Sequence, residues 1–466
     1  MTYEIFKRGI KPLIAFCAIR RRTDIMKKTG LINRKEFEGV LGYLRDICKK
    51  HLNKYPKLSK MYSQGFLNTL ETTTELLEDS TTYVFTGDIP AMWLRDSSAQ
   101  VSQYLALCGK DENIRKLVAG MLKRQFKYIQ IDPYANAFNK EADGRGHNDN
   151  TDKRSDWVWE RKYEIDSLCY PVWIAYKYFK ASGDNSVFDG DFAAAIKEIL
   201  RVWKIEQRHD TDSDYRFIRL GPGHEMDNLR NGGKGMPTNY TGLLWSGFRP
   251  SDDVCELHYL IPSNQFAVVV LGYLQEIYNN IIQDDATLKI ITELKSEIEF
   301  GIGHYGIVTH PVYGKIYAYE TDGYGNHVLM DDANVPSLLS LPYLGYCSTN
   351  DEIYQNTRKF ILSSDNPYYA AGKFAAGVGS PHTPAGYVWH IGLIMQGLTT
   401  DDKKEKAEIL SMLLKTDAGT DYMHEAFDPE NPENFTRPWF AWANSLFAIY
   451  INSLLPGIDE MMQGQD

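Results

Sequence analysis

Two kinds of helical segment alternate along the chain. In the first kind, apolar residues recur every three or four positions and Lys or Glu occupies the other face, which predicts helices that bury one stripe. These amphipathic segments are Arg34–Tyr55, Asn113–Ile131, Phe188–Arg208, Asp285–Phe300, Asp351–Ile361 and Lys403–Leu414. The second kind carries few charges and many apolar, aromatic or small residues, which predicts helices buried on all sides. These segments are Ser97–Cys108, Ile165–Phe179, Ser263–Asn279, Asn334–Leu344, Tyr387–Leu398 and Trp439–Leu455.

The alternation predicts an all-α fold. Six pairs of one buried and one amphipathic helix fit an (α/α)6 barrel, in which six inner helices are surrounded by six outer helices. An irregular helical domain is the alternative, whereas a solenoid is disfavoured because the chain has no fixed-length repeat. Residues Tyr305–Tyr319 predict a short hairpin. No linker-like stretch divides the chain, so we expect residues 31–466 to form a single domain.

The ends of the first predicted helix carry local signals. Asn33 and Glu36 resemble a capping box, and Pro56 is expected to stop the helix. Before it, the apolar stretch Ile10–Ile19 contains Lys11 and Pro12, is far too short to span a bilayer, and is followed by no small-residue cleavage site. We therefore expect residues 1–30 to be a mobile extension, and we expect no membrane segment.

Composition narrows the class of protein. The chain has 466 residues, of which 43% are hydrophobic and 24% are charged, as in soluble globular proteins. The net charge of -10 argues against a general binder of nucleic acids, because phosphate backbones are held by dense Lys and Arg. The six cysteines form no CxxC motif, which argues against a zinc ribbon or a redox motif. Reduced thiols in a cytoplasmic protein are the expected state.

The segments that precede the predicted buried helices are rich in Trp, Asp, Glu, Arg and His. In a barrel these loops gather at one end, where they would build a cup. Aromatic faces stack on the C–H face of a sugar ring, and carboxylates and Arg bind its hydroxyl groups, so the cup suits a carbohydrate. Any single acidic residue there is better explained as a helix cap, but six such loops together favour a binding cup. The loops contain Gly87–Asp96, Trp157–Asp166, Trp245–Asp253, Asp331–Asp332, Ser380–Pro384 and His424–Phe427, the last followed by Arg437, Trp439 and Trp442.

A cup of this kind can hydrolyse a glycosidic bond. The reaction needs one acid to protonate the leaving oxygen and a second carboxylate that either attacks the anomeric carbon or activates water. The loops supply several candidates for both roles, and spacing alone does not choose among them.

Four motifs in these regions resemble glycoside hydrolase family 125, and the resemblance extends from about Leu31 to the C-terminus. The motifs are GDIPAMWLRDSSAQ at 87–100, WSGFRPSDD at 245–253, LIPSNQF at 260–266, and HEAF with TRPWFAWAN within 424–444. The resemblance implies an (α/α)6 barrel and an inverting exo-α-1,6-mannosidase that releases terminal mannose from an oligosaccharide. It also implies that no metal and no other cofactor takes part.

The resemblance assigns roles to residues. It implies that Asp252 is the general acid and Glu425 the general base, and that Arg95 and Asp96 hold the terminal mannose. The other expected cup residues are Trp93, His382, Trp389, His390 and Trp439.

The assignment of Asp252 carries a physical tension. This residue is expected just before a helix, where the helix dipole lowers the pKa of a carboxyl group, whereas a general acid must keep its proton near neutral pH. Burial and the like charge of Asp253 are the expected means of reversing that shift. The choice between Asp252 and Asp253 rests on the resemblance.

Other functions compete with this interpretation. A phosphorylase, or a hydrolase for another α-linked sugar, would use the same scaffold, and a sugar-binding protein would need no carboxylate pair. A calcium-dependent mannosidase would use Asp322, Asp331 and Asp332, which lack EF-hand spacing. His224 and Glu225 lack the second His of a zinc HExxH motif.

Overall fold

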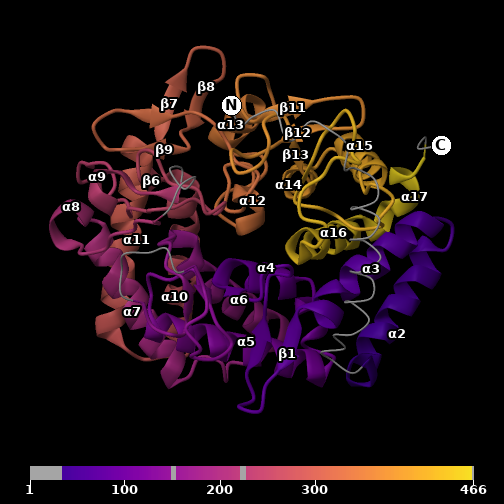
Figure 1. The fold of residues 1–466 in the computed structure, drawn as a ribbon, viewed down its shortest axis with the longest axis horizontal. Helices are drawn as coiled ribbons and strands as arrows, with labels where there is room; N and C mark the ends of the chain where they lie inside the picture. The colour runs from indigo at the N-terminus through magenta and orange to yellow at the C-terminus, as the bar shows by residue number, and fades with distance from the viewer. Residues whose placement is uncertain (1–33, 148–153, 221–226, 464–466) are drawn as a thin grey trace.

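The computed structural model describes residues 34–147, 154–220 and 227–463. The expected N-terminal extension, the capping residue Asn33 and the His224–Glu225 pair lie outside these ranges. Figure 1 shows the helices arranged in a closed ring.

The ring has two layers of helices. The inner helices are α4 (Leu94–Ser102), α6 (Ile165–Ser182), α10 (Ile261–Asn280), α12 (Leu341–Leu344), α14 (His390–Leu398) and α16 (Ala441–Leu454). The outer helices are α3 (Pro56–Thr72), α5 (Glu112–Ile131), α7 (Gly190–Glu206), α11 (Asp285–Tyr305), α13 (Glu352–Ile361) and α15 (Lys403–Lys415). Helix α16 contacts α4, which closes the inner ring, and each of α10, α14 and α16 packs on its outer partner α11, α15 or α3. The predicted (α/α)6 barrel is confirmed.

Burial explains why the two kinds of helix differ in sequence. Inner helix α14 is buried nearly all round. Outer helix α13 buries only Tyr354, Thr357, Phe360 and Ile361, which recur every three or four positions. The side chain of Asp351 caps α13 by accepting from the backbone N–H of Tyr354. Most buried apolar residues form one cluster that runs from the first described helices to the last.

The first outer helix differs from the prediction. The segment Arg34–Tyr55 is broken into a 3-10 turn (Arg34–Phe37), α2 (Glu38–Ile47) and a wide turn (Cys48–Leu52), and it lies outside the two-layer ring. Pro56 does end it, but the same residue begins α3, the true outer partner of α16. Helix α3 was missed because Ser, Thr, Asn and Gln interrupt its apolar stripe, and several of these polar side chains are buried.

The predicted inner helix Asn334–Leu344 is wrong over most of its length. Only Leu341–Leu344 is helical, as α12. Pro336 has no N–H to donate to a helix, and the N–H groups of Leu338 and Leu339 donate to the carboxylate of Asp331 instead of to helix carbonyls. The chain therefore stays irregular up to the last turn.

Short antiparallel strands join the loops that precede the inner helices. Three small sheets do this, and each joins two neighbouring loops. They are β3–β4–β5 (Met92–Trp93, Ala137–Phe138, Val158–Glu160) before α4 and α6, β6–β9–β10 (Tyr259–Leu260, Glu320–Thr321, His327–Val328) before α10 and α12, and β13–β14 (Val388–Trp389, Ala426–Phe427) before α14 and α16. The six loops are thus held as three loop pairs.

The remaining elements are small. Strands β7 (Ile307–His310) and β8 (Gly314–Tyr317) form the predicted hairpin, which is confirmed. The others are β1 (Thr74–Leu76) paired with β2 (Thr82–Val84), β11 (Tyr369–Ala371) paired with β12 (Ala376–Val378), and the short helices α8 (His209–Asp212), α9 (Arg230–Gly233) and α17 (Ile458–Met461). Within the described ranges, no helix is both long and apolar enough to cross a membrane.

Candidate active site

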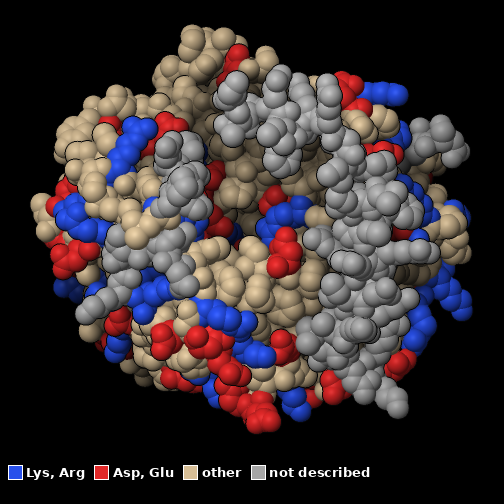
Figure 2. Space-filling view, in the orientation of Figure 1, with Lys and Arg blue, Asp and Glu red and all other residues tan. Residues whose placement is uncertain are grey.

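The three loop pairs surround a pocket that most of the predicted site residues line. Figure 2 shows that this face of the molecule is hollowed near its centre, with acidic and basic side chains in the hollow. The pocket is lined by Thr86, Ile89, Trp93, Arg95, Asp96, Pro250, Ser251, Asp252, Asn334, His382, Trp389, Glu425, Arg437, Phe440 and Trp442. Each loop pair contributes a charged residue: Arg95 comes from the first, Asp252 from the second and Glu425 from the third.

Arg95 lies at the centre of a cluster of carboxylates. Its Nη1 donates to Glu164 at 2.6 Å and to Asp166 at 3.2 Å. Its Nη2 donates to Oδ1 of Asp252 at 3.4 Å, and its Nε lies 3.5 Å from Asp96. The side chains of Arg95, Glu164 and Asp166 are almost completely buried. One buried cation therefore faces four carboxyl groups.

Asp252 lies in a turn and not at the start of a helix, which corrects the sequence-based expectation. Helix α10 begins only at Ile261. The backbone of Asp252 has φ 67°, and its N–H donates to the carbonyl of Arg249. Its Oδ1 accepts from Asn136 at 3.1 Å, and its backbone carbonyl accepts from Nζ of Lys162 at 2.6 Å. This turn aims the carboxyl group at Arg95.

Asn136 and Lys162 had no signal in the sequence. Asn136 lies between α5 and α6, and its Nδ2 also donates to Glu160 and Glu164. Lys162 is buried and also pairs with Asp227 at 3.0 Å. An Asn in a loop is usually a turn residue, so only the fold identifies this one as a bridge among three carboxyl groups.

The carboxyl pair Asp252 and Glu164 has unequal proton affinities. Burial disfavours ionisation of both, and they hydrogen-bond to one another. The pKa of Asp252 lies well below its usual range for three reasons: the charge of Arg95, a hydrogen bond from Glu164, and the charge of Lys162. Burial and the charge of Asp252 raise the pKa of Glu164 well above its usual range. The expected reversal by Asp253 is therefore not found, and these opposite shifts favour the proton of the pair on Glu164.

Glu425 has a different environment. Its Oε2 accepts from Oγ1 of Thr436 at 2.9 Å, and its Oε1 accepts from Nη1 of Arg437 at 3.3 Å. Arg437 also pairs with Asp88 at 2.6 Å, which fixes the guanidinium group. A hydroxyl group and a cation thus orient the carboxyl group of Glu425 at the pocket.

The side chain of Asp253 contacts His382 and Ser251, not the Arg95 cluster. Its Oδ1 lies 3.0 Å from Nδ1 of His382, and its Oδ2 accepts from Ser251. Burial disfavours the imidazolium form, but the hydrogen bond and charge of Asp253 raise the pKa of His382 to about 9. The half-exposed His382 is thus a cation at the pocket wall at neutral pH.

Two predicted cup residues do not line the pocket. His390 is buried between the backbone of His424 and the hydroxyl group of Thr416, and burial lowers its pKa to about 3. Trp439 is partly exposed and its Nε1 donates to Thr72. The aromatic lining comes instead from Trp93, Trp389, Phe440 and Trp442.

The acidic residues considered for calcium have internal roles. Asp331 accepts from two backbone N–H groups, and burial raises its pKa to about 8. Asp322 accepts from Tyr324 and Asn326 within a turn. Across the described ranges, no group of three or more His, Cys, Asp or Glu side chains is placed to hold a metal ion.

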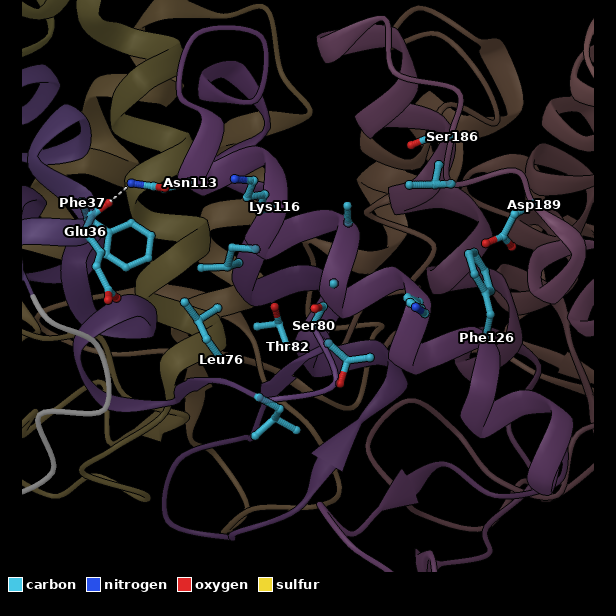
Figure 3. Close-up of a pocket in the computed structure, with 17 residues that line it drawn as sticks. Glu36, Phe37, Leu76, Ser80, Thr82, Asn113, Lys116, Phe126, Ser186 and Asp189 are labelled. Carbon is cyan, nitrogen blue, oxygen red and sulfur yellow. Dashed lines mark hydrogen bonds between the residues drawn. The ribbon is translucent and has the colours of Figure 1, made fainter.

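A larger hollow lies on the outer surface of the barrel. Figure 3 shows side chains of α5, the first 3-10 turn and the loop before α7 around it. Its lining is mainly apolar, with Leu76, Leu117 and Phe126 among the residues, and it lacks the clustered acids and aromatic rings of the pocket. The chemistry therefore belongs to the smaller pocket.

Comparison with known proteins identifies the family of the chain. A family model described as metal-independent alpha-mannosidase (GH125) matches residues 55–452. The chain is 40% identical over 420 residues to the meiotically up-regulated gene 157 protein of Schizosaccharomyces pombe, covering 85% of this chain and 82% of that protein.

Solved structures extend the comparison. A metal-independent α-mannosidase of Streptococcus pneumoniae, in a non-productive complex with α-1,6-mannobiose, is 47% identical with a TM-score of 0.88 and covers 90% of this chain and 99% of its own. A bacterial glucoamylase complexed with acarbose shares the fold alone, at 10% identity and a TM-score of 0.53, over 85% of this chain and 55% of that one.

Proposed function

The chain belongs to glycoside hydrolase family 125, the metal-independent α-mannosidases, and from that premise we propose that it is an exo-α-1,6-mannosidase. It removes mannose from the non-reducing end of an oligosaccharide with inversion at the anomeric carbon. The observation that carries the proposal is the solved relative at 47% identity, whose complex contains α-1,6-mannobiose.

Two carboxyl groups of the pocket perform the reaction. Glu425, which accepts hydrogen bonds from Thr436 and Arg437, takes a proton from water as the water oxygen bonds to the anomeric carbon. The glycosidic C–O bond breaks, and the leaving oxygen receives a proton from Asp252. Arg95 and Asp96 bind hydroxyl groups of the terminal mannose beside Asp252.

Aromatic and charged residues of the pocket recognise different parts of the sugar. Trp93 and Trp389, which are buried at the pocket wall, offer apolar contact to the ring. The charged groups form hydrogen bonds to hydroxyls, so a sugar with a hydroxyl group in the wrong position leaves buried polar groups unpaired. The preference for mannose over glucose follows from this penalty.

The test uses α-1,6-mannobiose followed by proton NMR. The first product should be β-mannose, released one residue at a time from the non-reducing end of longer substrates. Asp252→Asn should lose most activity on this linkage but retain more on an aryl mannoside with a good leaving group. Glu425→Gln should be poor on both, and α-mannose as first product would refute inversion.

The domain organisation and location are part of the proposal. Residues 31–466 act as one catalytic domain, which the continuous core from Phe37 to Met461 supports. A cytoplasmic location is supported by the five cysteines of the described ranges, which are all free thiols.

A further inference from the structure

The proposed function needs a proton on Asp252, the general acid. Asp252 is the partner that the surrounding cations favour as an anion. An anion cannot protonate a leaving oxygen. If Asp252 is the general acid, as the proposed function has it, its proton must come from a neighbouring group.

Asp252 and Glu164 share the same hydrogen-bond donors. Both accept from the same guanidinium group of Arg95, Glu164 through Nη1 and Asp252 through Nη2. Both accept from the amide nitrogen of Asn136. Two carboxylates in this arrangement are costly to ionise together, because neighbouring like charges repel, so the pair tends to recover its proton after each turnover.

The charge balance requires a proton in this cluster. Arg95 is the cation shared by four carboxyl groups. A second cation, Lys162, donates to the backbone carbonyl of Asp252. The charged and titratable groups that face the pair are Arg95 and Asp96 of α4, Glu160 and Lys162 before α6, Asp166 of α6, and His382 before β13. The side chain of Glu164 is fully buried, whereas that of Asp252 is 24% exposed towards the pocket.

We propose that Glu164 is a positioning residue that stores the proton which Asp252 delivers to the leaving oxygen. As the glycosidic bond breaks, its electron pair stays on the leaving oxygen, Glu164 passes its proton to Asp252, and Asp252 passes that proton on to the leaving oxygen. Glu164 ends as a carboxylate held by Arg95 and by Oγ of Ser167, which donates at 2.7 Å. Glu425 ends protonated, and exchange with solvent returns the proton to Glu164.

The test compares Glu164→Gln with the wild type on two substrates over a range of pH. The amide has no proton to pass on, so activity on α-1,6-mannobiose should fall about 10²-fold, while 2,4-dinitrophenyl α-mannoside should be affected far less. The alkaline limb of the profile should move to lower pH by about one unit or more, because Asp252 then titrates without its partner. Asp166→Asn is the matched control: it removes another carboxylate from Arg95 and should slow both substrates by a similar factor.

Ser167→Ala supplies a second variant, independent of whether Glu164→Gln folds. Loss of its hydroxyl group removes a donor to the ionised form of Glu164, so the pair should hold its proton more tightly and the alkaline limb should move to higher pH. Wild-type profiles in both variants would overturn proton storage. If Asp252→Asn itself keeps full activity on α-1,6-mannobiose, the proposed function is at fault instead.

Discussion

Replacing Arg95 by Met should destabilise the protein in a way that depends on pH. The substitution keeps an unbranched apolar stem but removes the cation from Asp166, whose side chain has no exposed surface. Removing one partner of a buried ion pair typically costs about 3–5 kcal/mol, because the remaining charge is left without compensation.

The stability of the variant depends on pH because a buried carboxylate that has lost its cation must take up a proton. An Asp with an ordinary pKa of about 3.9 costs about 4.2 kcal/mol to protonate at pH 7 but only about 1.5 kcal/mol at pH 5, at about 1.36 kcal/mol per pKa unit. The folded variant then binds more protons than the unfolded chain, so its stability falls as pH rises above the unfolded pKa. The pKa of Asp166 is already raised to about 6 in the wild type, which therefore also takes up this proton at pH 5. The loss relative to the wild type should accordingly be about 1 kcal/mol smaller at pH 5 than at pH 7.

Urea unfolding followed by tryptophan fluorescence measures this difference. Arg124→Met is the matched control, because Arg124 is equally buried but donates to the neutral oxygens of Thr81, Tyr128 and Lys140. Its carboxylate neighbour Asp79, 3.6 Å away, is 49% exposed, so water solvates that charge when Arg124 is lost. The control should be destabilised by a similar amount at both pH values. Equal losses at pH 5 and pH 7 in Arg95→Met would refute the reasoning that buried carboxylates dominate its stability.

Three further outcomes can be checked directly. Thr436→Val removes the hydroxyl donor that orients Glu425, so kcat on α-1,6-mannobiose should fall about tenfold, and an unchanged kcat would argue against Glu425 as base. Because the pKa of His382 is raised to about 9, its pairing with Asp253 should contribute stability that is full below about pH 6.5 and lost as pH rises through 9. Comparing His382→Gln with the wild type at pH 6 and pH 10 should reveal about 0.2–1 kcal/mol at pH 6 only. Excess EDTA should leave hydrolysis unchanged, and a loss that calcium or zinc restores would contradict a metal-free mechanism.

The fold was predictable from sequence where burial alone shapes the pattern. Apolar segments such as His390–Leu398 have no solvated face, so they could be placed in the inner ring. The prediction failed where polar side chains are buried or replace helix hydrogen bonds. Helix α3 buries Asn68 and Thr69, and the carboxylate of Asp331 takes over the N–H groups around Pro336.

The site residues that lie within sequence motifs could be predicted, and those outside the motifs could not. Asp252, Glu425, Arg95 and most of the expected aromatic residues do line one pocket. Asn136 carried no signal, because its role depends on three carboxyl groups that only the fold brings together. The protonation of the acid was also beyond the sequence, since it depends on distances to Arg95 and Glu164.

The joining of loops into pairs has a consequence for how specificity can change. Strand β13 is ordered by β14, so the loop that carries Trp389 cannot be replaced without its neighbour that carries Glu425. The same holds for β3 with β4 and β5, and for β6 with β9. Grafting a single loop from a related barrel would break a ladder and leave its backbone groups without partners. The unit of exchange, in evolution as in engineering, is therefore two consecutive helical hairpins with their shared sheet, and the barrel is a ring of three such modules.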